Sequence, residues 1–209
     1  MSCCVRGLSL LLACWPAVAA AFPQDLFGYR QVEQARIDEF PQWVDVLERH
    51  LRDDLRDGDC GERRLNRCHL REWQAFLRGL RGQPRQAQLE AVNRYANERD
   101  YVLDITNYGL EDYWAIPRQF LYNGGDCEDY AIIKFFSLRW LGFPMDELRI
   151  VVLQDTNLRV PHAVLAIGRA GDALILDNQL PQVLSHRAIV HYAPVYSINA
   201  QHWWLHLPR

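Results

Sequence analysis

A cysteine, a histidine and an aspartate, each placed at the end of an expected structural element, are the residues most suited to chemistry. Cys127 follows a Gly-Gly-Asp turn and opens a largely apolar stretch without Gly or Pro that runs to Leu141. We therefore expect it at a helix N-terminus, where free N–H groups and the helix dipole favour an anion. Such a thiol is activated as a nucleophile, and the same N–H groups can stabilise an oxyanion.

His162 and Asp177 are expected at one edge of a sheet. His162 begins one short apolar run and Asp177 ends the next, with a polar turn at 168–172 between them. In an antiparallel hairpin the start of one strand lies beside the end of its partner. A nucleophilic thiol needs a base, and the base needs an orienting acceptor. Asn178 is an alternative orienter, but neighbours in a strand point to opposite faces, so only one of the two can serve.

The elements that must position these residues are helices first and strands second. Apolar residues recur with the helical period over 40–55, 70–80 and 86–97, and the stretch 101–122 is irregular and rich in aromatic residues. Short β-type runs occupy 149–153, 162–167 and 173–177, and a further strand is expected at 195–198. This order indicates an α+β fold with one shared core, as a single domain over 22–209.

The composition excludes some classes of function. The chain has 209 residues, of which 49% are hydrophobic, so a substantial core can form. The formal net charge of −3 gives no electrostatic footprint for nucleic acid.

The first 21 residues have the pattern of a secretory signal peptide. One charge, Arg6, precedes a short apolar stretch and a run of small residues that ends at Ala21. We expect cleavage after Ala19 or Ala21, with an uncleaved anchor or a lipoprotein signal as alternatives. No other segment reaches about 18 apolar residues, so the mature chain is not expected to be embedded in a membrane.

Cleavage leaves three cysteines in an exported protein. Cys60 and Cys68 lie eight residues apart in a polar stretch and could form a disulfide in an oxidising compartment, or remain two surface thiols. A metal site with His69 would lack a fourth ligand at useful spacing. Pairing of Cys60 with Cys68 would leave Cys127 as the free thiol.

The carboxylates beside the nucleophile pose an electrostatic problem. Asp126, Glu128 and Asp129 place three negative charges next to a thiol that must ionise, which would raise its pKa. They could simply cap the helix and complement its dipole. Alternatively they could hold Ca²⁺, whose charge would offset theirs, although ideal helix geometry turns Glu128 away from the other two.

Several segments together resemble a known family. Trp114 to Pro117 (WAIP) and Gly124 to Ala131 (GGDCEDYA), followed by PHAVL at 161–165, LDN at 176–178 and PVYSIN at 194–199, look like the bacterial transglutaminase-like cysteine proteases of the LapG type. The similarity runs from about Phe40 to Trp204, and the GDCEDYA stretch is its most specific part.

This resemblance implies a papain/transglutaminase-like fold with a helical N-terminal half and a central helix, opened by the nucleophile, on an antiparallel sheet. It implies Cys127 as nucleophile, His162 as base and Asp177 as orienter, and it favours calcium held by the acidic residues that flank the cysteine. Trp114 would line the substrate groove or help to form the oxyanion hole, or else belong to the core.

The resemblance also implies a biological role. Such a protease acts in the periplasm, cleaves a large surface adhesin near its N-terminus and thereby disperses biofilm, and an inner-membrane cyclic-di-GMP receptor sequesters it. Two alternatives remain. A transglutaminase-like acyltransferase would use the same triad with an amine in place of water, and a non-catalytic, calcium-gated binding module would need no intact triad.

Overall fold

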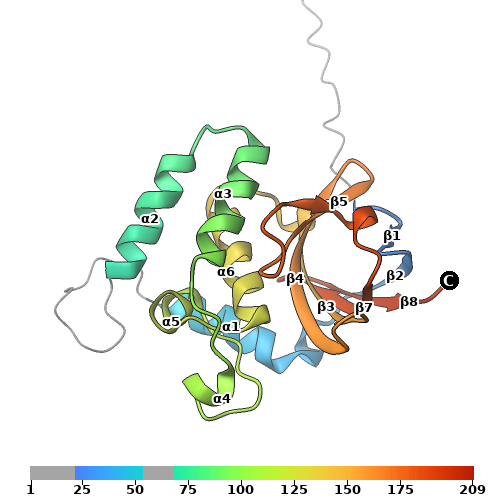
Figure 1. Cartoon of the computed structure of the whole chain (residues 1–209), viewed down its shortest axis with the longest axis horizontal. Coiled ribbons are helices and arrows are strands. Elements are labelled where there is room, and N and C mark those ends of the chain that lie inside the picture. Colours follow the sequence, from blue (N-terminus) through green and yellow to red (C-terminus); the bar gives the residue numbers. More distant parts are fainter. Residues whose placement is uncertain (1–21, 54–67) are drawn as a thin grey trace, which may run out of the picture.

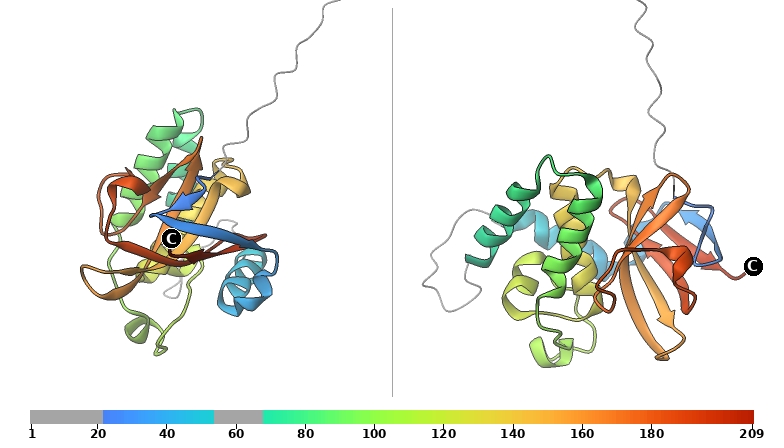
Figure 2. Two further views of the ribbon diagram at one scale, coloured as in Figure 1. Left: turned by 90° about the vertical axis from the view of Figure 1, so that its right-hand side faces the viewer. Right: turned by 45° about the horizontal axis from the view of Figure 1, so that its top comes forward.

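The computed structural model describes residues 22–53 and 68–209 of the chain. Within these ranges, the helices form a layer on one side of a curled antiparallel sheet (Figure 1). The right-hand view of Figure 2 shows the same separation of helices from strands. The α+β fold expected from the sequence is confirmed. The predicted signal peptide, residues 1–21, lies outside the described residues.

The helical layer is built around α6, the helix that Cys127 opens. The α-helices are α1 (Pro41–Arg52), α2 (Cys68–Leu80), α3 (Arg85–Asn97), α4 (Asp104–Asn107), α5 (Pro117–Asn123) and α6 (Cys127–Trp140), and three short 3-10 helices are η1 (Ile37–Glu39), η2 (Met145–Glu147) and η3 (His186–Ala188). Helix α6 packs against α3 and α5 on one side and against the sheet on the other. The helical periodicity of the sequence predicted the ends of α2 and α3 to within two residues. Helices α4 and α5 were not predicted, because they lie largely in the stretch 101–122, which was expected to be irregular.

The sheet has the strand order β1-β2-β8-β7-β3-β4-β5-β6, and all of its paired strands are antiparallel. Its strands are β1 (Asp25–Leu26), β2 (Tyr29–Gln34), β3 (Leu148–Asp155), β4 (Val160–Arg169), β5 (Asp172–Leu176), β6 (Leu184–Ser185), β7 (Tyr192–Ile198) and β8 (Trp203–Leu207). The expected hairpin is present as β4 and β5, with Leu165 opposite Leu176.

Two N-terminal strands were not expected from the sequence. Strand β2 pairs with β8, at the other end of the chain. Its sequence, YRQVEQ, has one apolar β-branched residue and no buried position, so local periodicity carries almost no strand signal. The pairing of β2 with β8 joins residues far apart in the sequence, and it holds the start of the described chain against its end.

Alternating residues of the central strands belong to two separate cores, so the single shared core expected from the sequence is wrong. Leu165 and Ile167 of β4 join the large cluster formed with the helices, whereas Val164 and Ala166 join a smaller cluster with Leu26. Because both faces of β4 are covered, its sequence is a continuous apolar run rather than an alternating one. This double burial makes β4 a rigid support for His162 near its start.

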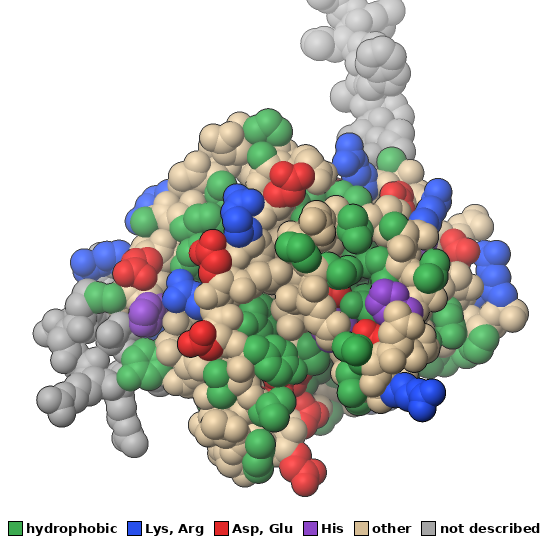
Figure 3. All heavy atoms as spheres, in the orientation of Figure 1, with side chains coloured by type: hydrophobic (Ala, Val, Ile, Leu, Met, Phe, Trp, Pro, Cys, Tyr) green, Lys and Arg blue, Asp and Glu red, His purple; other side chains and the backbone are tan. Residues whose placement is uncertain are grey.

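None of the helices in the described ranges is long and apolar enough to cross a bilayer. Acidic and basic side chains are interspersed over the face shown in Figure 3. Cys68, at the start of α2, is disulfide-bonded, and Cys60, the partner expected from the sequence, lies outside the described residues. Cys127 is a free cysteine.

Candidate active site

The nucleophile's position depends on two glycines. Gly124 has φ +72, and a Cβ there would collide with the backbone oxygen of Asp100. A Cβ on Gly125 would collide with the carboxylate of Asp129. This turn places Cys127 at the first position of α6, as the sequence predicts.

The sulfur of Cys127 lies against the strand that carries His162. Helix α6 packs on β4, and the backbone N–H of Ala163 donates a hydrogen bond to the sulfur. The thiol itself donates to Glu128 Oε2 at 3.2 Å. The nucleophile therefore contacts the residue next to His162 on one side and a carboxylate on the other.

His162 and Asp177 form a buried pair. His162 Nε2 lies 2.9 Å from Asp177 Oδ1, and the two side chains are 1% and 0% exposed. The other carboxylate oxygen accepts a hydrogen bond from the Tyr192 hydroxyl at 2.5 Å, and the backbone N–H of Gln179 donates to Oδ1 at 2.9 Å. Burial opposes ionisation of Asp177, but these hydrogen bonds outweigh it and hold its pKa below the ordinary value.

The contact with Asp177 defines the state of the imidazole. An ionised carboxylate only accepts hydrogen bonds, so Nε2 of His162 carries the proton and Nδ1 is the free acceptor. Gln179 Nε2 lies 3.4 Å from Nδ1. Nδ1 is thus the atom that can take a proton from a thiol, and Asp177 rather than Asn178 contacts the imidazole.

The surroundings of Cys127 disfavour a thiolate. Burial raises the pKa of the thiol, and the neighbouring carboxylates of Glu128 and Asp126 raise it further. Only the N–H of Ala163 acts in the opposite direction. The electrostatic problem anticipated from the sequence is therefore present in the folded chain.

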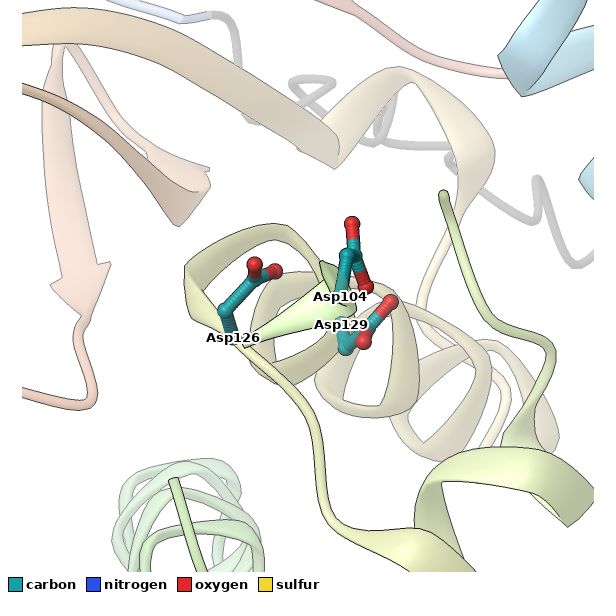
Figure 4. Close-up of side chains that lie close together, drawn as sticks. All are labelled: Asp104, Asp126 and Asp129. Atoms are coloured by element: carbon teal, nitrogen blue, oxygen red, sulfur yellow. The ribbon is translucent and has the colours of Figure 1, made fainter. Parts of the chain in front are cut away.

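Three aspartates, which we call the acidic cluster, meet at the start of α6: Asp104, Asp126 and Asp129 (Figure 4). One oxygen from each lies within 4.8 Å of the others. Asp104 and Asp129 each accept one hydrogen bond, from the N–H groups of Tyr113 and Ala115. Each of the three aspartates also has a buried oxygen with no hydrogen-bond partner among the described residues.

The acidic cluster fits a divalent cation better than it fits helix capping. Asp126 occupies the N-cap position of α6, but its side chain makes no capping hydrogen bond. Burial raises the pKa of Asp104 to about 6 and that of Asp129 well above the ordinary value. Buried carboxylates with orphaned oxygens are costly, and hard oxygen donors of this kind suit Ca²⁺.

Asp104 was not identified from the sequence. It lies in α4, 22 residues before Asp126. It reaches the cluster because the backbone N–H of Val102 donates to Gly125 O at 2.9 Å, so that this segment runs beside the turn before α6. No local pattern in the sequence predicts that contact.

Glu128 borders the acidic cluster without belonging to the group of Asp104, Asp126 and Asp129. Its carboxylate groups with Asp104 and Asp112, and it accepts the hydrogen bond of the Cys127 thiol. Burial, with a further contribution from the hydrogen bond with Asp126, raises the pKa of Glu128 to about 9. Its expected part in metal binding stays a prediction, and its observed contact is with the nucleophile.

Trp114 belongs to the hydrophobic core. It is 7% exposed, and its ring meets Trp43 edge to face at 6.2 Å between centroids. Its indole N–H donates to Asp112 Oδ1 at 3.1 Å. That donor is engaged elsewhere, and a role for Trp114 at the oxyanion or in the substrate groove stays a prediction.

Two further side chains support the His–Asp pair and were missed in the sequence. Tyr192 donates to Asp177 from the start of β7, and Asn97 of α3 donates to the Asp177 backbone oxygen at 2.8 Å. Both reach Asp177 across more than ten residues of chain from other elements. Nothing in their local sequence distinguishes them from ordinary surface or core positions.

Comparisons with known proteins agree with this geometry. The model of the family described as bacterial transglutaminase-like cysteine proteinase matches residues 59–208. Solved structures of LapG from Legionella pneumophila match with 33% identity over 78% of this chain and 86% of that chain, with a TM-score of 0.61. A calcium-bound form of that protein matches with a TM-score of 0.62, and an EGTA-treated form with 0.61. No curated protein matches the sequence.

The matched region contains α6, β4 and β5, and so all the residues of the candidate site. The family match spans well over half of the chain, and the structural relative exceeds 30% identity. The chain belongs to the bacterial transglutaminase-like cysteine proteinases and is a LapG-like cysteine protease.

Proposed function

We propose that this protein is an exported, calcium-dependent cysteine endopeptidase that uses Cys127, His162 and Asp177. The observation that carries the proposal is the buried His162–Asp177 pair. Strand β4, which carries His162, also contacts the Cys127 sulfur through the next residue, Ala163. A pure binding module would need no such arrangement. Membership of a proteinase family supports hydrolysis over acyl transfer to an amine.

The residues divide the chemistry as follows. Cys127 gives its proton to His162 Nδ1, and the thiolate attacks the carbonyl carbon of the scissile peptide bond. The N–H groups at the start of α6 stabilise the oxyanion that forms. His162 returns the proton to the leaving amine, which departs and leaves a thioester. His162 then accepts a proton from water, whose oxygen attacks the thioester carbon; the C–S bond breaks, the acid leaves, and His162 returns its proton to the Cys127 sulfur.

Asp177 keeps the imidazole oriented throughout. With Nε2–H bound to Asp177, Nδ1 is directed away from the carboxylate and available for proton transfer. The carboxylate also stabilises the imidazolium that forms when the thiol ionises. Tyr192 and Gln179 hold the carboxylate in this position through both of its oxygens.

Asp104, Asp126 and Asp129 would hold calcium. When bound, the ion supplies positive charge that offsets the carboxylates around the thiol. The orphaned oxygens of the acidic cluster support this assignment. The existence of calcium-bound and EGTA-treated forms of the Legionella pneumophila LapG supports it independently.

We infer the substrate and setting from the LapG-type resemblance. The substrate is the N-terminal region of a large cell-surface adhesin, which cleavage releases from the cell, promoting biofilm dispersal. The enzyme acts in the periplasm after removal of residues 1–21, and an inner-membrane cyclic-di-GMP receptor sequesters it. The signal-peptide pattern supports the export step.

The test is to incubate the mature protein with purified N-terminal fragments of candidate adhesins and to map any new termini. We expect one cut in the presence of calcium and none after addition of a chelator. The Cys127→Ala variant is the control for contaminating proteases. Cleavage that survives this substitution would refute the nucleophile, and cleavage that survives chelation would refute the calcium requirement.

A further inference from the structure

Arg149 of β3 is a buried cation without an ion pair. The residue is 8% exposed, and its hydrogen bond runs from Nη1 to the amide oxygen of Gln31 at 2.6 Å. Among the described residues no carboxylate forms an ion pair with it. Burial lowers the pKa of Arg149 to about 9 and Glu33 opposes this shift, so the group is still charged near pH 7. A buried charge is costly unless an opposite charge balances it at short range.

Aromatic rings cover the faces of this guanidinium. Its central carbon lies 3.5 Å from the centre of the Trp204 ring and 3.8 Å from that of Phe22. Phe22 can pack here because Gly168 has no side chain, since a Cβ on Gly168 would lie 2.6 Å from the Phe22 ring. With its faces covered, the guanidinium can bind a further partner only along an edge.

One edge of the Arg149 guanidinium makes no hydrogen bonds. Nε is buried and has no partner among the described residues. Nη2, on the same edge, makes no hydrogen bond with those residues either, and it keeps some contact with solvent. Two parallel N–H groups on one edge match the two oxygens of a carboxylate.

Arg149 lines a cavity of about 640 Å³, a size that is common for sites that bind small ligands. The other charged or titratable side chains of the lining are Glu33, Asp146 and His202. Glu33 accepts a hydrogen bond from Trp204 Nε1 at 3.1 Å, and Glu33 and Asp146 are largely in contact with solvent. Arg149 is therefore the buried charge of this cavity.

The cavity is separate from the catalytic residues, none of which lines it. Arg149 precedes Leu153, the strand partner of His162, by four residues on β3, which is about 13 Å along the strand. A ligand bound at Arg149 would therefore not occupy the position of a scissile peptide bond.

We propose that this cavity binds a carboxylate group, which Arg149 holds through Nε and Nη2 between the rings of Phe22 and Trp204. A planar carboxylate fits this edge because it can lie in the plane of the guanidinium. Its charge balances that of the buried cation. The carboxylate belongs either to a free small acid or to an acidic side chain of a bound peptide, and the chemistry of recognition is the same.

The first test is calorimetric binding to the mature protein, with probes that separate the two sources. Succinate is the free acid, the peptide acetyl-Gly-Glu-Gly-amide presents a carboxylate side chain, and acetyl-Gly-Gln-Gly-amide is its neutral match. We expect at least one carboxylate probe to bind with a Kd of about 1 mM or below, and the neutral peptide not to bind. Binding of neither carboxylate probe, or equal binding of the two peptides, would overturn the proposal.

The second test replaces the cation. Arg149→Met keeps an unbranched side chain between the rings, and the affinity for the probe that binds should fall at least about tenfold. Arg149→Lys keeps a charge but not the paired N–H groups and should also weaken binding, by a smaller factor. Arg169→Met, at an exposed position of β4 outside the cavity lining, is the matched control.

Circular dichroism establishes that each variant is folded. Native affinity in a folded Arg149→Met or Arg149→Lys variant would contradict the assignment of Arg149. Because the readout is binding, these results do not depend on whether the protein cleaves any peptide.

Discussion

The carboxylate of Asp177, which follows strand β5, and those of the acidic cluster, at the start of α6, have opposite hydrogen-bonding environments. Both oxygens of Asp177 accept hydrogen bonds from protein groups, and its pKa lies below the ordinary value. The aspartates of the acidic cluster each keep an orphaned oxygen, and their pKa values are raised. Protein groups alone therefore stabilise the charge of Asp177, whereas the described protein groups satisfy the aspartates of the acidic cluster only in part.

The two regions have different roles: one orients the catalytic imidazole, and the other affects the charge beside the catalytic thiol. The His–Asp pair must be oriented at all times, and a rigid sheet with partners from β7 and α3 does that. Burial raises the pKa of Cys127 most, and the carboxylates of Glu128 and Asp126 raise it further, so we propose that an ion bound at the acidic cluster offsets part of this effect. We therefore propose that the fold itself forms the catalytic pair and that the nucleophile ionises when calcium neutralises the acidic cluster.

The largest effect should come from the nucleophile itself. Replacing Cys127 with alanine removes the attacking atom, so cleavage of an adhesin fragment should fall to the background rate, at least about 10³-fold. The side chain is small, so the melting temperature should change by no more than a few degrees. Residual cleavage above background by the folded variant would contradict the assignment.

Asp177→Asn tests the His162–Asp177 pair. An amide can donate to Nε2 and so favour the wrong tautomer of His162, and we expect kcat to fall about 10²- to 10⁴-fold. Asn178→Ala is the matched control, because the neighbouring side chain makes no contact with the imidazole in the structure. Similar losses in both variants would show that the orienter is not Asp177.

Asp104→Asn tests the acidic cluster as a calcium site. The amide keeps an acceptor for the N–H of Tyr113 but removes one charged ligand, so calcium affinity measured by calorimetry should fall about 10- to 100-fold. Cleavage should then require proportionately more calcium, with kcat at saturation close to that of the native enzyme. Glu111→Gln, an exposed carboxylate outside both groups of acidic residues, is the control and should leave the calcium affinity unchanged.

Tyr192→Phe tests how much the hydroxyl of Tyr192 contributes to holding Asp177. It removes one of the donors to Asp177, while the bonds from His162 and Gln179 remain. We expect kcat to fall about three- to tenfold with KM nearly unchanged, corresponding to the loss of one charge-assisted hydrogen bond. A loss as large as that of Asp177→Asn would show that the hydroxyl has a direct catalytic role.

The smallest effect concerns stability of the chelated protein. Burial raises the pKa of Asp104 from near 3.8 to about 6, so the folded state binds this proton more tightly than the unfolded chain does. As pH rises from about 4 to about 6, the contribution of Asp104 to the free energy of unfolding therefore becomes unfavourable, and the folded protein loses stability. Asp104→Asn should raise the melting temperature of the chelated protein near pH 7 by a few degrees, with little change near pH 4.

Local sequence predicts the elements that hold Cys127, His162 and Asp177. A helix without Gly or Pro after a Gly-Gly-Asp turn, and two apolar runs joined by a polar turn, are short-range patterns, and α6, β4 and β5 follow them. The positions of the three residues suggested the triad, and the resemblance to a known family strengthened it, because a cysteine at a helix start is by itself an ordinary core residue.

The unpredicted parts of the site depend on contacts between distant segments. Asp104 joins the acidic cluster through backbone pairing of the 100–102 segment with Gly125, and Tyr192 of β7 reaches Asp177, at the end of β5, from three positions away in the sheet order. Strand β2 depends on β8 in the same way. Periodicity and turn signals describe neighbours in sequence and contain no information about such pairings.

The most direct test of the central claim is the alkylation rate of Cys127 in the mature, unsubstituted protein with and without calcium. Cys127 is a free cysteine, and Cys68 is disulfide-bonded, so a slow thiol reagent followed by peptide mass mapping reports this sulfur. We expect calcium to accelerate alkylation at least about tenfold near pH 7, with full reversal by a chelator, because neutralising the acidic cluster lowers the thiol pKa. Equal rates in calcium and in chelator would contradict the account.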